Sequence, residues 1–411
     1  MNVVDSKHLI VIGGGAAGFF VAANAARINP SLKVTLLEKG SKLLSKVKVS
    51  GGGRCNVTHA CFDIAEMSRK YPRGGNFLKK SFHQFFVTDT IQWFRERGVM
   101  LKTEEDGRMF PVTDSSETVI DCLMHEVIAH HVEIVMNAEV RTVCKEGGKF
   151  LVELSGSRTL ASDFVCIASG GYNKSLSFEW IRQLGHTIEE PVPSLFTFNV
   201  PGHPITRLMG ISVTDAHVKF AGSRLSERGP VLITHWGLSG PAVLRLSAWG
   251  ARELAVCRWQ FTVTLSWLPD FNENSLKERF QELRNESASQ RILNKSKFGL
   301  PLRLWQFLGE ESGVAADVRW ADLSAKVQNQ FIRNLVNYNL TISGKTTFKE
   351  EFVTAGGVHV GEIDVNTMQS KILPGLYFAG EVMNVDGITG GFNFQHAWTS
   401  GWIAAKAIAS R

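Results

Sequence analysis

A glycine-rich segment near the start of the chain has the residue types and spacing that bind a diphosphate. It spells GGGAAG over residues 13–18 and follows the apolar run LIVI of residues 9–12. In a strand–turn–helix unit, Gly13 permits the tight turn, Gly15 lets the backbone approach a pyrophosphate, and Gly18 lets the helix pack on the strand. The N-terminus of that helix also attracts negative charge. We therefore expect a dinucleotide to be bound by Gly13, Gly15, Ala16, Ala17 and Gly18.

An acidic residue at the end of the next predicted strand fits the ribose of the same ligand. The run KVTLLE over residues 33–38 predicts a strand that ends in Glu38, twenty residues after Gly18. That is about the spacing at which a carboxylate meets a ribose hydroxyl in dinucleotide-binding folds. Glu38 and the adjacent Lys39 are therefore candidate cofactor-binding residues.

A second glycine-rich segment, KVKVSGGGRCN over residues 46–56, must approach another group closely. The guanidinium of Arg54 could bind a phosphate in a fork, and the amide of Asn56 could hydrogen-bond the edge of a ring. A glycine-rich turn with an exposed arginine is the alternative. The candidate cofactor-binding residues here are Lys46, Gly53, Arg54, Cys55 and Asn56.

The C-terminal region holds a third group of candidates. A predicted strand over residues 376–379 leads to Gly380 and Glu381, and Gly390-Gly391 opens the last predicted helix. A helix N-terminus stabilises negative charge on a group bound at that end, such as a reduced cofactor ring. The candidates are Gly380, Glu381, Gly391, Phe392 and Asn393, and backbone near the cofactor is also expected at Val140, Ala168, Ser169 and Gly170.

Two residues are candidates for a direct role in a reaction. His235 lies in the segment HWGLSGP, which predicts a loop followed by a helix, and histidine is the residue type that most often relays protons in enzymes. Asn393 would help to hold the negative charge of a reduced cofactor at the start of the last helix. A turn at a domain junction is the alternative for His235, and helix capping is the alternative for Asn393.

The elements that must position these residues predict an α/β fold. The first 60 residues predict a βαβ unit with its helix over 16–28, and further helices are expected over 77–97 and 119–130. Strands are expected over 132–136, 138–144, 150–154 and 164–168, as a β-meander within a nucleotide-binding domain.

A linker at residues 191–193 starts a β-rich insert, and a helical insert follows with helices over 275–285, 315–330 and 331–338. A strand over 352–360 and a helix over 391–409 complete the first domain. We expect segments 1–190 and 346–411 to form that domain, 191–270 the β-rich insert and 271–345 the helical insert.

Composition excludes several classes of protein. Of the 411 residues, 44% are hydrophobic and 20% charged, which is typical of a globular protein. No apolar run is long enough to cross a membrane, and no signal peptide is recognisable. The six cysteines form no CxxC pair, so no metal site is expected and a reducing cytoplasm is favoured. The net charge of +6 is a mild excess, and Arg69, Lys70, Arg73, Lys79 and Lys80 are interpreted as a solvated face, so a nucleic-acid partner is not expected.

At its motifs the chain resembles the YhiN/BaiN-like flavoproteins, a family of FAD-dependent oxidoreductases. The matching segments are GGGAAG, SGGGRCNVT (50–58), GRMFP (107–111), THWGLSGPAVL (234–244), VTAGGV (353–358) and PGLYFAGEVMNVDGITGGFNFQHAWTSG (374–401). The resemblance implies one FAD on a Rossmann-like domain that is interrupted by a β-barrel-like insert and a small helical insert.

The expected activity is hydride transfer between a small organic substrate and flavin N5, with NAD(P)H as reductant. No second GxGxxG is present, so a nicotinamide would bind only transiently. An O₂-dependent amine oxidase and an RNA-associated flavoprotein similar to tRNA-modifying enzymes are the alternatives.

Overall fold

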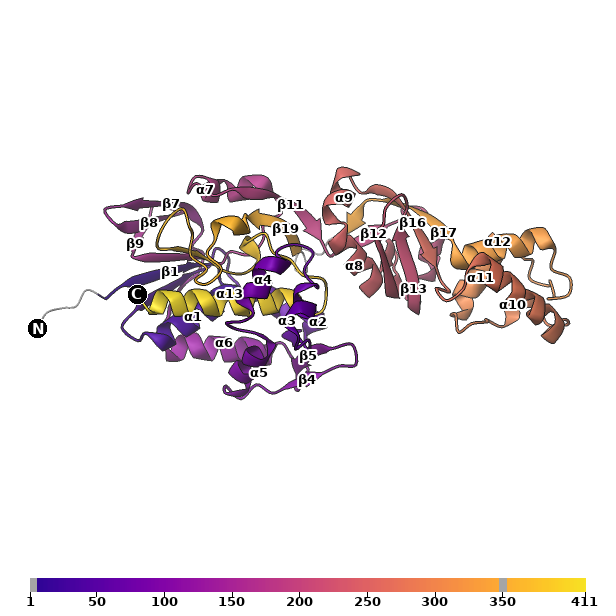
Figure 1. The fold of residues 1–411 in the computed structure, drawn as a ribbon, viewed down its shortest axis with the longest axis horizontal. Helices are drawn as coiled ribbons and strands as arrows, with labels where there is room; N and C mark the ends of the chain where they lie inside the picture. The colour runs from indigo at the N-terminus through magenta and orange to yellow at the C-terminus, as the bar shows by residue number, and fades with distance from the viewer. Residues whose placement is uncertain (1–5, 347–352) are drawn as a thin grey trace, which may run out of the picture. The chain divides into compact units, whose positions relative to one another are not determined.

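The computed structural model describes residues 6–346 and 353–411 of the chain. They form two compact units (Figure 1). The chain up to Ser194, with the described residues from 353 onward, builds the first unit. The second unit starts at Leu195 and includes the described residues up to 346. Phe352, the first residue of one predicted strand, lies outside the described residues.

A five-stranded parallel sheet forms the centre of the first unit, in the order β20-β10-β1-β2-β6. The central strand is fully buried at Leu9, Ile10 and Val11, as expected for a parallel sheet covered on both faces. The strands are β1 (His8–Ile12), β2 (Lys33–Leu37), β6 (Glu133–Val135), β10 (Phe164–Ile167) and β20 (Leu376–Phe378).

Smaller antiparallel sheets complete the first unit. The meander consists of β7 (Val140–Glu146), β8 (Lys149–Leu154) and β9 (Thr159–Ser162). The predicted meander strands over 132–136 and 164–168 belong instead to the parallel sheet as β6 and β10. The other sheets contain β3 (Thr58–His59), β4 (Leu101–Thr103) and β5 (Arg108–Pro111), and β11 (Ile188–Ser194) with β19 (Val353–Val358).

The helices of the first unit agree with the sequence at both ends of the chain and at α6 (Glu117–Ala129), which was predicted over 119–130, and differ over 77–97. The predictions of α1 (Ala16–Ile28) and of a final helix, α13 (Phe392–Ala409), are confirmed. The single helix predicted over 77–97 is wrong, because the chain forms α4 (Gly75–Ser81) and α5 (Val87–Arg95). The carboxylate of Asp89 accepts the N–H of Phe86 and so starts a new helix there. The remaining helices are α2 (Ser45–Gly53), α3 (Ile64–Ser68) and α7 (Glu179–Arg182).

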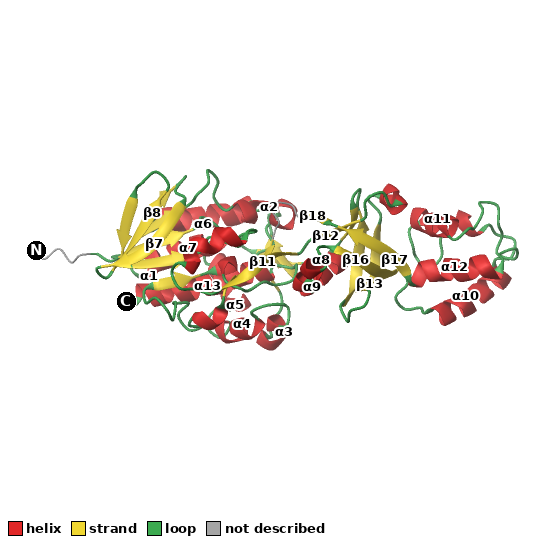
Figure 2. Ribbon diagram, turned by 90° about the horizontal axis from the view of Figure 1, so that it is seen from above, coloured by secondary structure: helices red, strands yellow, loops and turns green. Residues whose placement is uncertain are grey.

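The second unit contains a seven-stranded antiparallel sheet in the order β17-β16-β13-β14-β15-β12-β18. Because β17 and β18 are edge strands, the described strands do not close into a barrel, and the barrel-like expectation is corrected in this respect. The strands are β12 (Thr197–Asn199), β13 (Ser212–Phe220), β14 (Ser226–Ile233), β15 (Gly237–Ser239), β16 (Gln260–Ser266), β17 (Tyr338–Ser343) and β18 (Lys345–Thr346), and α8 (Pro241–Trp249) and α9 (Ala251–Val256) lie between β15 and β16 in sequence. Several of the strands are visible beside α8 in Figure 2.

A helical part between β16 and β17 contains α10 (Glu273–Glu286), α11 (Leu302–Glu311) and α12 (Ala325–Val336). The helices predicted over 315–330 and 331–338 are wrong, because one helix starts after Ser324, whose hydroxyl caps it, and α11 was missed. The packing that overrides the local pattern is an aromatic core of Phe280, Trp305, Trp320 and Phe331, all fully buried or nearly so.

Candidate functional site

In the turn between β1 and α1, two of the predicted glycines are required by the fold itself, and the third is not. Gly13 has a φ of +117°, and a side chain there would overlap the carbonyl of Ala168. A side chain at Gly18 would overlap the carbonyl of Gly13. Gly15 has an ordinary φ of −95°, and a Cβ there would meet no atom within 4 Å. The space beside Gly15 at the N-terminus of α1 is therefore open, which fits a bound pyrophosphate.

Glu38 lies next to this turn. Its carboxylate accepts the N–H of Gly14 at 2.8 Å and the N–H of Gly40 at 2.7 Å. Each carboxylate oxygen has a second lone pair, so the group can still accept a ribose hydroxyl. The ammonium of Lys39 lies over the ring of Tyr172, 5.6 Å from its centroid.

The remaining backbone candidates follow the ends of neighbouring strands. Ala168 follows β10 and donates its N–H to Ile12, and Ser169 comes next in the chain. Gly170 has a φ of +76° and open space at its Cβ position. Val140 begins the meander strand β7.

The second glycine-rich segment ends α2 in a left-handed turn. Gly51 and Gly52 have φ values of +59° and +70°, and a Cβ at Gly52 or Gly53 would meet nothing within 4 Å. Cys55 follows with a φ of +60° and is fully buried. Burial raises the pKa of its thiol to about 12, so the thiol is not a ready nucleophile at neutral pH.

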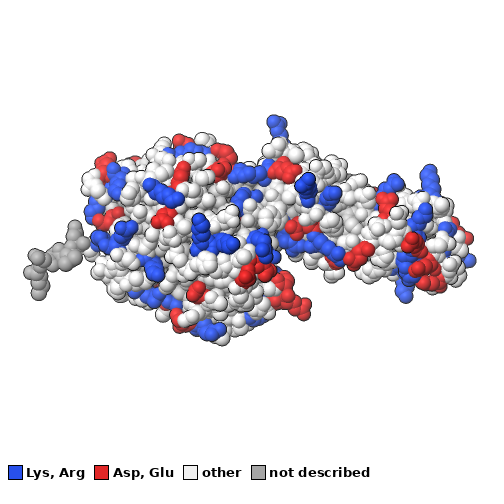
Figure 3. Space-filling model, viewed as in Figure 1, with Lys and Arg blue, Asp and Glu red and all other residues white. Residues whose placement is uncertain are grey.

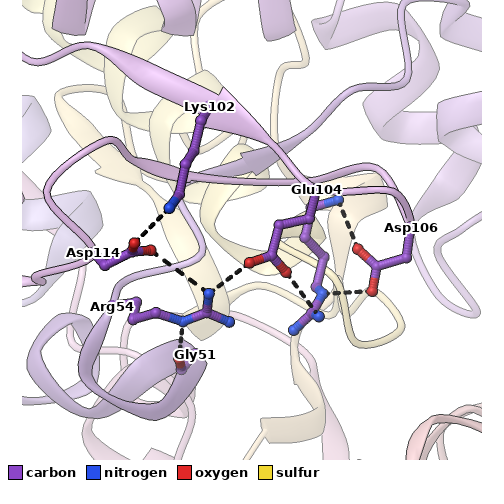
Figure 4. A network of polar contacts seen from close by, with 7 residues as sticks. Gly51, Arg54, Lys102, Glu104, Asp106 and Asp114 are labelled. Carbon is purple, nitrogen blue, oxygen red and sulfur yellow. Dashed lines mark hydrogen bonds and ion pairs between the residues drawn. The ribbon is translucent and has the colours of Figure 1, made fainter.

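Arg54 forms a polar network with the hairpin of β4 and β5 (Figure 4). Its guanidinium donates to Glu104 at 2.5 Å and to the carbonyl of Gly51 at 3.3 Å, and Asp114 lies 3.6 Å away. The guanidinium also stacks over Phe110, with 4.0 Å to the ring centroid. In this structure Arg54 ties the glycine-rich turn to the hairpin, and its contact with a phosphate stays a prediction.

The N-terminus of α13 is joined to the segment that follows this turn. The amide of Asn56, oriented to satisfy both neighbours, donates to the carbonyl of Thr58 and accepts the N–H of Gly391, each at 3.0 Å. Further along, the indole of Trp398 donates to the carbonyl of Val57 at 2.9 Å. The ring of Phe392 stacks on His59 with 4.6 Å between centroids.

Gly380 and Glu381 are held by three other elements. The hydroxyl of Ser400 accepts the N–H of Gly380, and Nε2 of His396 lies 3.1 Å from its carbonyl. Glu381 accepts the N–H of Thr354 at 2.9 Å and pairs with Lys46 at 2.7 Å. This brings β19, α2 and α13 together around the end of β20.

The two candidates for a direct catalytic role lie in different units. Asn393 is in the first turn of α13, where its amide exchanges two hydrogen bonds with the backbone of Gly387, at 2.8 and 3.1 Å. His235 is the exposed tip of a tight turn in the second unit, between Thr234 and Gly237. Both catalytic assignments stay predictions.

A buried ion pair involves the segment before α13, and the sequence did not predict it. Arg73 binds both carboxylate oxygens of Asp386, and the hydroxyl of Ser194 donates to the same carboxylate at 2.9 Å. The side chain of Asp386 is fully buried and that of Arg73 is 14% exposed, so assigning Arg73 to a solvated face is wrong. Their separation of 313 residues leaves no local signal that could have revealed the pair.

The family is decided by a match over nearly the whole chain. Residues 7–407 match the model described as the HI0933-like protein Rossmann domain. The chain belongs to the HI0933-like family. The chain is 31% identical to the ribosomal RNA dihydrouridine synthase of Escherichia coli, over 97% of both chains. It is 28% identical to the 3-dehydro-bile acid delta(4,6)-reductase of Clostridium scindens, over 98% of both chains.

Solved structures share the fold of this HI0933-like protein. The open conformation of a flavocytochrome c3 fumarate reductase aligns with a TM-score of 0.51 and 15% identity, over 100% of this chain and 79% of the other. The 3-ketosteroid-delta4-(5alpha)-dehydrogenase of Rhodococcus jostii RHA1 aligns with a TM-score of 0.51 and 13% identity, over 98% of each chain.

These matches confirm the resemblance seen in the motifs and the Rossmann-like fold. The HI0933-like protein is an FAD-dependent oxidoreductase. The open space beside Gly15 fits the cofactor, and the turn at α1 would hold its pyrophosphate. Among the helices of residues 6–346 and 353–411, none has the length and apolar character needed to cross a membrane.

We predict that Gly15→Val removes FAD while Gly18→Val prevents folding. A valine at residue 15 would fill space that no protein atom occupies, and the backbone there has an extended conformation that valine adopts readily. A valine at residue 18 would overlap the backbone of the turn itself. The measurement is the flavin absorbance of each purified variant, with circular dichroism as a check on folding. Full flavin content in a folded Gly15→Val protein would contradict the site.

We also predict a pH-dependent stability that originates at His396. Burial lowers the pKa of this imidazole from 6.5 to about 4. Between these values the unfolded chain binds a proton that the folded chain does not, so stability present above pH 6.5 is lost as the pH falls. Denaturation midpoints at pH 7 and pH 5 should therefore differ less for His396→Gln than for the wild type. His125→Gln, at an exposed position of α6, is the matched control and should leave the difference unchanged.

Proposed function

We propose that this enzyme uses NAD(P)H to saturate a ring C=C bond that is conjugated with a carbonyl group. The support is chemistry that two of its relatives' names have in common. Dihydrouridine is uridine with its conjugated ring double bond saturated, and a delta(4,6)-reductase of a 3-dehydro bile acid saturates double bonds conjugated with the 3-oxo group. Both relatives are matched over at least 97% of their length.

We propose the uracil ring of ribosomal RNA as the substrate. Relatives from Escherichia coli and Haemophilus influenzae, at 31% and 29% identity, both carry the ribosomal RNA dihydrouridine synthase name.

The distribution of charge along this chain favours the same substrate class. Residues 195–347 contain 18 of the 45 Lys and Arg residues and 12 of the 39 Asp and Glu residues, so they carry a formal charge of +6. The rest of the chain contains 27 of each and is neutral. A positively charged second unit would attract a polyanionic substrate such as RNA.

The reaction consumes NAD(P)H and one proton for each double bond, and one hydrogen is added to each carbon. FAD, when bound, would accept the hydride of the nicotinamide and deliver it to one carbon of the double bond. The N-terminus of α13, opened by Gly391, would stabilise negative charge that arises on the reduced cofactor. The proton for the other carbon comes from a side chain, for which we propose His235.

The local structure around His235 suits a proton donor. The side chain is exposed at the tip of the Thr234–Gly237 turn. Its ring lies 4.1 Å from the ring of Trp236, and the indole of Trp236 donates to the hydroxyl of Thr197 at 3.1 Å. The imidazole is therefore accessible to a substrate, and the neighbouring Trp236 is held by its hydrogen bond to Thr197 of β12.

The proposed function is tested with the purified holoenzyme, NADH or NADPH, and ribosomal RNA from an Escherichia coli strain that lacks its own related enzyme. Nucleoside mass spectrometry should detect a new dihydrouridine, heavier than uridine by two hydrogens. Parallel reactions contain a 3-oxo-4,6-diene bile acid or an amine with O₂. Saturation of the bile acid alone would make the substrate a steroid, and amine oxidation without NAD(P)H consumption would contradict the proposed reaction class.

We predict that His235→Ala lowers turnover by roughly 10²–10⁴-fold, the usual contribution of a general acid. FAD content and the rate of flavin reduction by NAD(P)H should stay unchanged, because the histidine acts on the substrate. His217→Ala, which changes another histidine of the same unit, is the control and should keep full turnover. Full turnover of His235→Ala on the identified substrate would leave His235 as a turn residue only.

A further inference from the structure

We propose that the helical part of the second unit binds the phosphate backbone of the RNA through a pair of arginines, Arg291 and Arg319. This inference rests on the proposed function for its ligand. It also adds a docking surface that lies on elements other than those of the candidate flavin site.

The two arginines face each other across a short antiparallel bridge. The N–H of Ile292 donates to the carbonyl of Val318, and the N–H of Trp320 donates to the carbonyl of Gln290, each at 3.0 Å. These bonds flank the arginines, which therefore form the closer, non-hydrogen-bonded type of pair with both side chains on one face.

The buried neighbours fix the direction of this face. Ile292 is 0% exposed and Trp320 is 1% exposed, and both belong to the core of the second unit. Successive residues of extended chain point to opposite sides, so Arg291 and Arg319 point toward solvent, and both are exposed. The two bridged segments that carry the arginines are held in place by the core beneath them. Trp320 packs against the ring of Phe280, and the indole of Trp305 donates to the carbonyl of Ile292.

In the described part of the chain, neither arginine of the pair has an acidic partner within 4.0 Å. Asp317 and Asp322 flank Arg319 in sequence but form no ion pair with it. On α10, the carboxylates of Glu282 and Glu286 are bound to Arg279. Like charges directly opposite each other repel, so the pair costs stability until an anion lies between the two groups.

Other positive groups extend the surface next to the pair. Lys295 is exposed in the segment that follows Arg291, and the ammonium of Lys297 lies 3.4 Å from the hydroxyl of Ser287. Guanidinium groups bind phosphate oxygens in a planar fork, and a series of cations suits a ligand with repeated phosphates. On the face of the molecule in Figure 3, basic and acidic side chains are interspersed over both units.

The position of the helical part within its own unit agrees with a docking role. Gln260 pairs with Ser343 at one end of β16 and β17, and Leu265 pairs with Tyr338 at the other end. The helical part is inserted at the Leu265 end, whereas the chain leaves the unit after Lys345 and Thr346, beyond the Ser343 end. Within the second unit the helical part and the point where the chain leaves the unit therefore lie at opposite ends of the paired strands β16 and β17, one strand length apart.

The experiment compares RNA binding by the wild-type holoenzyme and by Arg291→Gln/Arg319→Gln. The probes are a fluorescein-labelled oligouridylate and Escherichia coli ribosomal RNA, titrated at several salt concentrations. The double variant should bind at least about tenfold more weakly, and the slope of log K against log salt should become shallower by about 1.5 to 2, as for two lost phosphate contacts. Flavin reduction by NAD(P)H should not change.

The control variant is Arg228→Gln/Arg279→Gln, which removes the same charge from two exposed arginines of the same unit. Each of these is already bound to two carboxylates. It should bind RNA more tightly than the Arg291/Arg319 variant. Equal losses in both variants would mean that net charge alone matters, and unchanged binding by the Arg291/Arg319 variant would also overturn the proposal.

Two further measurements separate this proposal from others. Inorganic phosphate that displaces RNA no better than chloride of the same ionic strength supports a polyanion surface, whereas tight phosphate binding with no gain for RNA would overturn it. Thermal unfolding of the double variant at low salt should occur at the wild-type temperature or above, because repulsion is relieved. RNA binding through the pair without dihydrouridine formation would refute the proposed reaction and leave the docking surface standing.

Discussion

The close packing of α13 on α1 is the contact on which the rest of the first unit depends. A Cβ at Gly401 would lie 3.2 Å from the carbonyl of Ala17, and a Cβ at Gly380 would lie 2.7 Å from the Cβ of Ala17. Phe20 and Trp398 fill the space beside these small residues, with 5.2 Å between ring centroids. A helix formed by the last residues of the chain is thereby fixed against the helix that follows the first glycine-rich turn.

Buried polar groups then give this packing a single register. The side-chain oxygen of Gln395 accepts the hydroxyls of Thr58 and Thr90, at 2.6 and 3.1 Å. A buried polar group without a partner is costly, so a slipped or rotated α13 would be penalised at each of these bonds. The same helix holds Gly380 through Ser400 and His396. Segments from four distant parts of the chain are therefore joined before any cofactor is considered.

The two units differ in net formal charge. A neutral first unit carries the dinucleotide turn, and the second unit carries the entire net charge of the chain. Within that second unit, Arg228 and Arg245 are bound to carboxylates. An arginine pair set on a hydrophobic core without such partners therefore differs from its surroundings in electrostatics, and its cost has to be offset by packing of the core beneath it.

Local pattern alone determined much of this protein. The apolar run before GGGAAG, the small residues of α1 and the acid after β2 predict a dinucleotide-binding unit, because each depends on neighbours in sequence. The start of α13 after Gly391 follows from the same kind of signal. Family motifs spread along the chain added the cofactor class.

Tertiary structure decided what depends on residues that are distant in sequence. The break between α4 and α5, the assignment of β6 and β10 to the parallel sheet, and the helix α11 reflect packing that outweighs local propensity. The structure shows Glu104 as a partner of Arg54, and it shows Arg73, which was expected on a solvated face, buried on Asp386. No local pattern specifies such partners, because an ion pair depends on where the folded backbone places both charges.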